Sequence, residues 1–253
     1  EYAHVPMILA PDRSKLSKRH GATSVEQFRQ EGYLPEALVN YMALLGWAPE
    51  GDEIFSLPEA IAQFTLDRVN KTAAVYDMPK LTWMNGHYLR EGELKRIVSS
   101  AEPFYRQEGL ISEELDSQGR QYLRQVVEIV RDREKTLLEV ARASTYFYQD
   151  SFTYDQKGAN KFFRKEGTSG ILRSAAAKIL SLTDFDAAAI ARAYNELAKS
   201  LELPVGRLMP LSRLAVSGRT MGPELFDIMA VLGPKRVAYR LQRTADYIDT
   251  HFS

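Results

Sequence analysis

Apolar residues recur at helical spacing along most of this chain, and residue types that begin and end helices stand at the edges of these runs. Pro35 and Gly46 bound one run, since proline favours the first helical position and glycine the end. Ser56 precedes a proline and an acid, the order typical of a helix start. Gly233 and Pro234 mark the end of one helix and the start of the next. The apolar residues expected to share a helix face are Leu38, Tyr41, Met42 and Leu45; Tyr122, Val126, Ile129 and Val130; and Val237, Leu241, Ala245 and Ile248. The chain is therefore predicted to be mainly α.

The charges of the chain balance overall but are unevenly distributed. Its 253 residues include 33 basic and 33 acidic side chains, so the net charge is zero. Seven acids and no Lys or Arg lie between Arg29 and Arg68, whereas three arginines and no acid lie between Leu203 and Pro223. Such segregation lets a neutral chain present a positive surface to a polyanion.

Composition also argues against several kinds of site. The chain has no cysteine, so it has no disulfide and no thiolate metal site. Its four histidines lie far apart, without the spacing of a metal-binding pair, and we expect no metal site. No apolar run approaches the ~18 residues of a membrane span and no signal peptide is visible, so we expect a cytoplasmic protein.

Breaks in the helical pattern divide the chain into three blocks. We predict these blocks at residues 1–90, 91–155 and 156–253. The stretch 155–170 is polar and contains several glycines, which is typical of a hinge or an exposed connection, and residues 90–92 form a second candidate.

A short basic loop stands near the beginning of the chain, with the sequence Lys15-Leu16-Ser17-Lys18-Arg19-His20-Gly21. The apolar residues 5–10 before it are predicted to form a short buried strand, and residues 11–14 a turn, so the loop should project. Two ammonium groups three residues apart, with a hydroxyl between them, suit an oligophosphate. Taken alone the pattern is weak, and a solvated basic turn is the commoner outcome.

This loop resembles the KMSKS region of class I aminoacyl-tRNA synthetases, in the K-[LI]-S-K-R-x-G variant of the glutamyl branch. Residues 31–41 resemble the branch's G-[YF]-L-P-E-A-L-x-N-Y signature. Residues 53–57, 77–90 and 211–226 are similar to three further signature blocks. The resemblance covers almost the whole chain and is to bacterial-type glutamyl-tRNA synthetase. It implies a KMSKS loop and helical stem-contact region over 1–90, followed by two all-helical anticodon-binding subdomains over 91–155 and 156–253.

The resemblance implies that the parent enzyme activates glutamate with ATP and Mg²⁺ to an acyl-adenylate and transfers the acyl group to tRNA-Glu. Because negative charge moves onto the departing pyrophosphate, cations on the loop stabilise the transition state more than the ground state. Lys18 and Lys15 are accordingly expected to be catalytic. Lys15, Ser17, Lys18 and Arg19 are expected to contact ATP, although Arg19 could equally be a structural clamp.

The family's active site also requires an HIGH motif, and no such tetrapeptide occurs in this sequence. We therefore expect the chain to be the C-terminal portion of the enzyme and to be inactive by itself. We also expect a monomer with no membrane contact.

The resemblance further implies a set of tRNA contacts. Arg133 would read the third anticodon base, since a guanidinium can form a fixed fork of hydrogen bonds to a base edge; the alternative is a surface arginine paired with Glu134 or Asp132. Trp83 is expected in the core. The remaining predicted tRNA contacts are Arg90 in the stem-contact region and Arg213, Pro223 and Leu225 at the anticodon-loop site.

Three other interpretations stand beside this one. A freestanding, non-catalytic RNA-binding helical module fits the helical pattern, but it leaves the intact loop without a purpose. Glutaminyl-tRNA synthetase shares the loop variant, but its anticodon region is built from β-barrels. The short glutamyl-queuosine-type paralogue has no anticodon domain and cannot account for residues 91–253.

Overall fold

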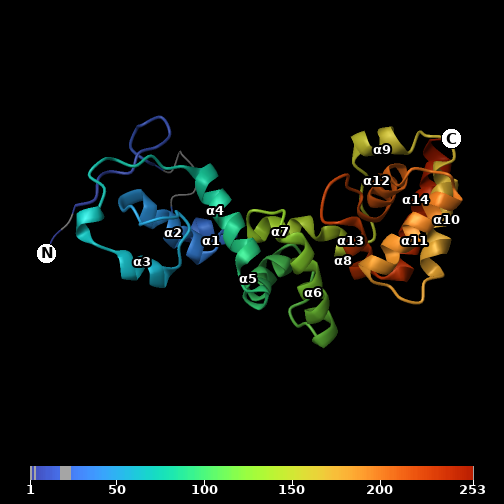
Figure 1. The fold of residues 1–253 in the computed structure, drawn as a ribbon, viewed down its shortest axis with the longest axis horizontal. Helices are drawn as coiled ribbons and strands as arrows, with labels where there is room; N and C mark the ends of the chain where they lie inside the picture. The colour runs from blue at the N-terminus through green and yellow to red at the C-terminus, as the bar shows by residue number, and fades with distance from the viewer. Residues whose placement is uncertain (1, 3, 18–23, 253) are drawn as a thin grey trace. The chain divides into compact units, whose positions relative to one another are not determined.

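The fold is almost entirely helical, as shown by a computed structural model that describes residues 2, 4–17 and 24–252 (Figure 1). These residues contain fourteen α-helices, one 3-10 helix and only isolated β-bridges. The mainly α prediction is confirmed. The chain divides into two compact units: unit 1 comprises Glu1–Gly109 and Arg131–Arg142, and unit 2 comprises Leu110–Val130 and Ala143–Ser253. The predicted blocks 1–90, 91–155 and 156–253 stay a prediction about functional parts.

Unit 1 begins with short helices, and several of them begin or end at the proline, glycine and serine residues that favour helix ends. Its elements are α1 (Val25–Gln30), α2 (Pro35–Gly46), α3 (Leu57–Gln63), the 3-10 helix η2 (Leu66–Arg68), α4 (Met78–Glu91), α5 (Leu94–Gln107) and α7 (Leu137–Ala143), which belongs to unit 1 up to Arg142. As predicted, α2 begins at Pro35 and ends at Gly46. At α3 the Ser56 hydroxyl accepts from the Glu59 amide, and the Glu59 carboxylate accepts from the Ser56 amide. Two backbone donors that the helix leaves unpaired are satisfied in this way.

The core of unit 1 is formed where α2 packs on α4. Its buried residues are Phe28, Tyr33, Tyr41, Leu45, Tyr76, Leu81 and Met84. The Tyr41 hydroxyl accepts a hydrogen bond of 2.6 Å from the backbone amide of Asp77, and the Asp77 carboxylate in turn caps α4 through the Lys80 amide. Burial raises the pKa of Tyr41 to about 12, so the hydroxyl stays neutral.

Two expectations for unit 1 are wrong. Residues 5–10 do not form a buried strand: Leu9 makes isolated bridges to Lys15 and Val75, while Val5 and Met7 are more than half exposed. A strand requires a ladder of paired residues, and in the described residues pairing within this segment is confined to Leu9. Trp83 is half exposed rather than in the core, because Leu81, Met84 and Leu89 occupy the buried face of α4.

Unit 2 contains the longest of the described helices, α14. Its elements are α6 (Ser117–Val130), α8 (Thr145–Tyr148), α9 (Gln156–Phe162), α10 (Thr168–Leu180), α11 (Ala187–Ser200), α12 (Val205–Ser217), α13 (Leu225–Leu232) and α14 (Pro234–His251). Helices α10 and α14 pack along each other (Figure 1). The four apolar residues predicted to share a face of α14 are all buried, and the predicted break at Gly233 separates α13 from α14.

The prediction of a hinge or exposed connection at residues 155–170 is wrong for its first half. Helix α9 occupies this stretch, capped by a 2.6 Å hydrogen bond from the Gly158 amide to the Asp155 carboxylate. Ala159 and Phe163 are buried beneath it. This helix is difficult to recognise in the sequence because it is short and most of its residues are polar or glycine. The predicted break at 90–92 coincides with the short connection between α4 and α5.

Arg240 on α14 holds together the irregular parts of unit 2. Its side chain is 0% exposed, and its guanidinium donates to the carbonyls of Val216, Tyr146 and Gln149 and to the Asp150 carboxylate over 2.6–3.0 Å. Burial lowers the pKa of Arg240, and the hydrogen bond to Asp150 opposes this effect. One side chain thus joins α14 to the end of α12, to α8 and to the segment after α8.

We expect Arg240→Met to destabilise unit 2 by about 2–4 kcal/mol, because the change leaves buried carbonyls without a donor. Urea unfolding followed by far-ultraviolet circular dichroism measures the effect. Arg192→Met is the matched control, since Arg192 is exposed on α11. Equal unfolding midpoints for the two variants would contradict the assignment.

Candidate nucleic-acid interface

The basic loop of unit 1 begins from a tight turn. The Ala10 amide donates to the Ser14 carbonyl over 2.8 Å, and the Asp12 carboxylate accepts from the amide and hydroxyl of Ser14. These bonds fix the position of Lys15, which is exposed and forms an antiparallel bridge with Leu9. Ser17 is half-buried. The other two predicted ATP contacts, Lys18 and Arg19, lie outside the described residues.

Two cationic side chains converge on Gly86 in α4. At the place where a β-carbon on Gly86 would stand, Lys135 Nζ is 3.3 Å away and Arg90 Nη1 is 3.4 Å away. Within the described residues neither of the two side chains forms an ion pair. Because two positive charges this close repel each other, an anion that bound both would be stabilised. Arg90 is one of the predicted tRNA contacts, and Lys135 lies next to it. Contact of Arg90 with tRNA stays a prediction.

A buried amide places Lys135 beside α4. The side chain of Asn85 is 0% exposed, and it donates to the Lys135 carbonyl over 2.5 Å while accepting from the Leu34 amide over 2.7 Å. A second attachment follows at once, where the Leu137 amide donates to the Gly32 carbonyl over 2.9 Å. Gly32 has a φ of 85°, and a β-carbon there would stand 2.6 Å from the Leu138 amide nitrogen. The segment Arg131–Arg142 is therefore held against the first part of unit 1.

Arg133 lies in this same segment and is exposed. Arg131, two residues earlier, is partly buried and donates to the Gly92 carbonyl over 2.7 Å. The two arginines thus differ in position: Arg131 anchors the segment and Arg133 faces outward. The predicted role of Arg133 in reading the anticodon stays a prediction.

The predicted anticodon-site residues of unit 2 surround the loop between α12 and α13. Arg213 Nη1 donates to the Pro223 carbonyl over 2.5 Å. Pro223 is buried and Leu225 is 1% exposed, so the side chains of both face the interior. The loop presents Arg219 and Met221 instead, and Met221 is 77% exposed. Contact of Arg213, Pro223 and Leu225 with RNA stays a prediction.

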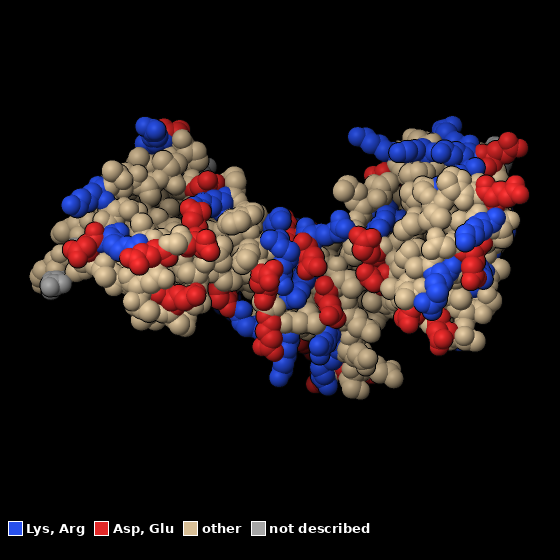
Figure 2. Space-filling view, viewed as in Figure 1, with Lys and Arg blue, Asp and Glu red and all other residues tan. Residues whose placement is uncertain are grey.

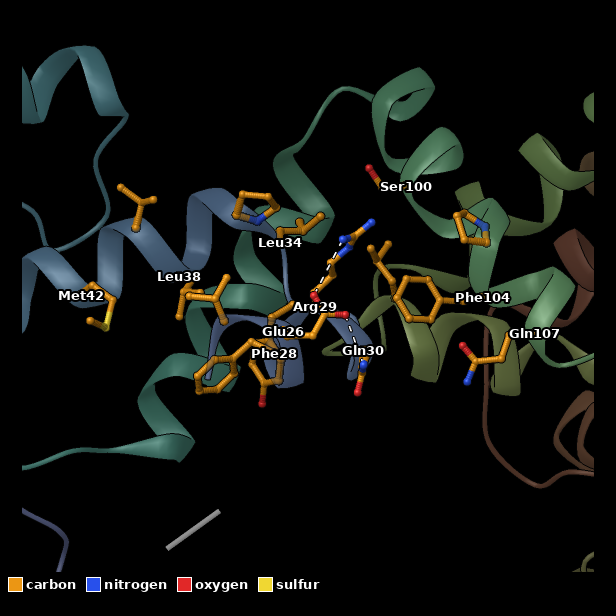
Figure 3. Close-up of a pocket in the computed structure, with 16 residues that line it drawn as sticks. Glu26, Phe28, Arg29, Gln30, Leu34, Leu38, Met42, Ser100, Phe104 and Gln107 are labelled. Atoms are coloured by element: carbon orange, nitrogen blue, oxygen red, sulfur yellow. Dashed lines mark hydrogen bonds and ion pairs between the residues drawn. The ribbon is translucent and has the colours of Figure 1, made fainter. Parts of the chain in front are cut away.

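Unit 1 also contains an apolar groove between α1–α2 and α5. Figure 3 shows Phe28, Leu34, Leu38 and Met42 on one side and Phe104 on the other, in a groove of about 880 Å³. Arg29 is the one cation among its lining residues, and it lies 3.8 Å from Glu26. A groove with this mostly apolar lining does not suit a polyanion and is not part of the candidate interface.

Comparison with known proteins identifies the family. The family described as anticodon binding domain matches residues 96–245, and the family described as tRNA synthetases class I (E and Q), catalytic domain, matches residues 1–83. Glutamate–tRNA ligase of Moorella thermoacetica is 54% identical over 248 residues, which are 98% of this chain and 51% of that protein. Glutamate–tRNA ligase 1 of Caldanaerobacter subterraneus is 48% identical over 250 residues, with the same two shares. The chain belongs to the glutamate–tRNA ligase family.

The fold of this family member agrees with a solved structure. The crystal structure of a glutamate tRNA ligase from Elizabethkingia meningosepticum, in complex with its amino acid, matches with a TM-score of 0.85 at 26% identity. That match covers 98% of this chain and 52% of the other. The resemblance to bacterial-type glutamyl-tRNA synthetase is confirmed. The chain spans about half the length of the curated relatives it matches.

Two features do not occur in the described residues. None of their helices combines the length and apolar character that a bilayer crossing requires. They also hold no group of three His, Asp or Glu side chains placed to bind a metal ion.

The sequence pattern alone could have indicated that Asn85 has a structural role. Asn85 lies among Leu81, Met84 and Leu89 on one face of α4, and a polar residue on an apolar face needs a hydrogen-bond partner. The identity of that partner, 50 residues away, could not be inferred from the helix alone.

We expect Asn85→Leu to destabilise unit 1 by about 2–4 kcal/mol, because the Leu34 amide and the Lys135 carbonyl would remain buried without partners. Chemical unfolding measures the loss, and hydrogen exchange should show faster opening around Lys135. Asn195→Leu, at an exposed position of α11, is the control. A variant as stable and as protected as the control would refute the role of the amide.

Proposed function

We propose that this chain is the part of a glutamate–tRNA ligase that binds tRNA-Glu and supplies a phosphate-contacting loop to the catalytic site. The enzyme would ligate glutamate to tRNA-Glu through a glutamyl-adenylate formed from ATP. The observation that carries this proposal is 54% identity to a glutamate–tRNA ligase along 98% of the chain. One chain also matches both a catalytic and an anticodon-binding family.

In the catalytic step, the proposed role of the loop is electrostatic. Lys15 and Lys18 would approach the phosphates of ATP, with Ser17 and Arg19 beside them, as negative charge develops on the departing pyrophosphate. Lys15 is suited to this role because it is exposed and its backbone is fixed by the turn at Asp12. Mg²⁺ would arrive with ATP and neutralise phosphate oxygens, which are the ligands that this ion prefers.

In the binding step, the proposed contacts come from both units. Arg90 and Lys135 would hold a phosphate in the stem of the tRNA, and Arg133 would read the anticodon. The exposed loop between α12 and α13 would contact the anticodon region, supported from beneath by Arg213, Pro223 and Leu225. Phosphate contacts of this kind make affinity fall steeply with salt concentration. A freestanding, non-catalytic RNA-binding module is not favoured, because residues 1–83 match a catalytic family.

The activity can be tested in a chimera that joins this chain to the part of the Moorella thermoacetica ligase that it does not match. We expect the chimera to charge tRNA-Glu with glutamate. Lys18→Ala should lower glutamate-dependent pyrophosphate exchange by about 100-fold or more, as expected when one preorganised contact to the transition state is removed. Lys95→Ala, an exposed lysine on α5, should leave the rate unchanged. An active chimera in which Lys18→Ala has no effect would reject the loop's role.

The same chimera tests discrimination between tRNAs. Arg133→Gln should narrow the ratio of charging efficiencies for tRNA-Glu and tRNA-Gln, by an amount equivalent to about 1–3 kcal/mol for one bidentate base contact. Arg124→Gln, at an exposed position of α6, removes the same charge and should leave the ratio unchanged. Equal loss of activity on both tRNAs would assign Arg133 to the stem or to folding. A parent that charges both tRNAs equally would show that Arg133 does not discriminate.

A further inference from the structure

Helix α9 and the residues after it form an uncompensated basic surface on unit 2. Lys157, Lys161, Arg164 and Lys165 are all exposed. Lys157 and Lys161 are four residues apart and share one side of α9, and Arg164 and Lys165 follow its end. Figure 2 shows Lys and Arg gathered over α9 along the upper edge of unit 2. Within the described part of the chain, none of the four forms an ion pair. We call these residues the α9 cations.

Two basic residues on α10 are paired with acids, unlike the α9 cations. Arg173 on α10 lies 2.7–2.8 Å from the carboxylates of Asp246 and Asp249. Lys178 lies 2.6 Å from Glu196. Because the four α9 cations lie within nine residues of one another and are not neutralised by acids, they should produce a local positive potential.

An aromatic hollow adjoins α9, which contributes Gln156 and Ala159 to its lining. It has a volume of about 450 Å³ and is bounded by α9, the segment before it and the end of α14. Its aromatic walls are Phe152, Tyr154, Tyr247 and Phe252, all partly exposed, and Arg243 lies 4.9 Å from the centre of the Phe152 ring. At the rim, the guanidinium of Arg164 lies 5.6 Å from the Phe252 ring.

The hollow adjoins the loop that is expected to meet the anticodon. The Asp155 amide, just before α9, donates to the Gly218 carbonyl over 2.8 Å. Gly218 has a φ of 72°, and a β-carbon there would stand 2.6 Å from the Phe152 ring. Gly158 is packed as closely against the Thr220 methyl group. An RNA strand that contacts Arg219 or Met221 would therefore lie close to the hollow.

We propose that this surface is an RNA subsite in which the aromatic hollow takes one unpaired base and the α9 cations bind the adjoining phosphates. Unpaired RNA bases stack on aromatic side chains and arginine planes, while lysines track the backbone, and both elements occur together here. The aromatic walls alone would accept many apolar groups, but the adjacent unpaired cations select a polyanion. The subsite rests on the proposed function, because tRNA-Glu is the RNA expected to carry the base.

The first experiment removes charge. Binding of a tRNA-Glu transcript to the chain is measured by fluorescence anisotropy over a range of salt concentrations. The double variant Lys157→Gln/Lys161→Gln should reduce the slope of log K against log salt by about 2, since each phosphate-bound lysine contributes about 1. The matched control is Arg192→Gln/Lys199→Gln, which removes the same charge from α11 and should keep the wild-type slope.

The second experiment tests the hollow. Phe252→Ala should weaken binding about tenfold and leave the salt slope unchanged, because stacking carries no charge. Since this change also removes packing from the end of α14, a second variant, Thr153→Glu, places a carboxylate at the exposed rim and should weaken binding without loss of stability. Urea unfolding checks the stability of both. Irradiation of a transcript containing 4-thiouridine should cross-link Phe152, Tyr154, Tyr247 or Phe252.

The outcomes separate this inference from the proposed function. If the wild-type chain does not bind tRNA-Glu at low salt, the proposed function fails and the subsite fails with it. If binding is normal but the charge variant keeps its slope and no cross-link falls in the hollow, the subsite alone is overturned. A reduced slope with cross-links confined to the α12–α13 loop would also overturn it, because the base would then lie elsewhere.

Discussion

The buried amide of Asn85 is the contact on which the arrangement of unit 1 depends. It joins three segments that are distant in sequence: the start of α2, helix α4 and the stretch that carries Arg133 and Lys135. A hydrogen bond at the protein surface contributes little net stability, but an unpaired amide or carbonyl in a dry interior is costly. Because the partners of Asn85 are backbone groups, the amide fixes the positions of Leu34 and Lys135 whatever side chains those positions carry. It therefore sets the register in which Lys135 meets Arg90 at Gly86.

Arginine performs the corresponding task in unit 2, where the irregular segments are held through their carbonyl groups. Arg240 collects three carbonyls, Arg213 takes that of Pro223 and Arg207 that of Glu166. Of these three arginines Arg240 also pairs with the Asp150 carboxylate, which offsets part of its charge. These contacts explain how the acid-free stretch between Leu203 and Pro223 is tied into a stable unit.

The sequence allowed prediction of those features that depend on neighbouring residues. Helix boundaries at Pro35, Gly46, Ser56 and Gly233 are local effects of φ preference and side-chain capping, and the structure reproduces them. Three predictions were wrong because the outcome depends on what packs against each segment. They concern helix α9, the exposure of Trp83 and the segment at residues 5–10. In the candidate site, Arg90 and Lys15 followed from motifs, but Lys135 became visible only when Asn85 brought its segment against α4. Lys18 and Arg19 lie outside the described residues, so their roles rest on resemblance alone.

Both candidate phosphate sites depend on a glycine that lets two groups approach more closely than a β-carbon would allow. At Gly86 the space is occupied by the side chains of Lys135 and Arg90, and at Gly158 by the Thr220 methyl group. The consequences differ because the neighbours differ. A methyl group at Gly86 would press on the flexible chain of Lys135, which can move aside, so the pair of cations would separate while unit 1 stayed folded. A methyl group at Gly158 would press on the loop that follows α12, and its effect would reach the backbone at Gly218. Cation spacing in unit 1 can therefore vary at small cost to folding, whereas in unit 2 the basic helix and the loop beside it are constrained together.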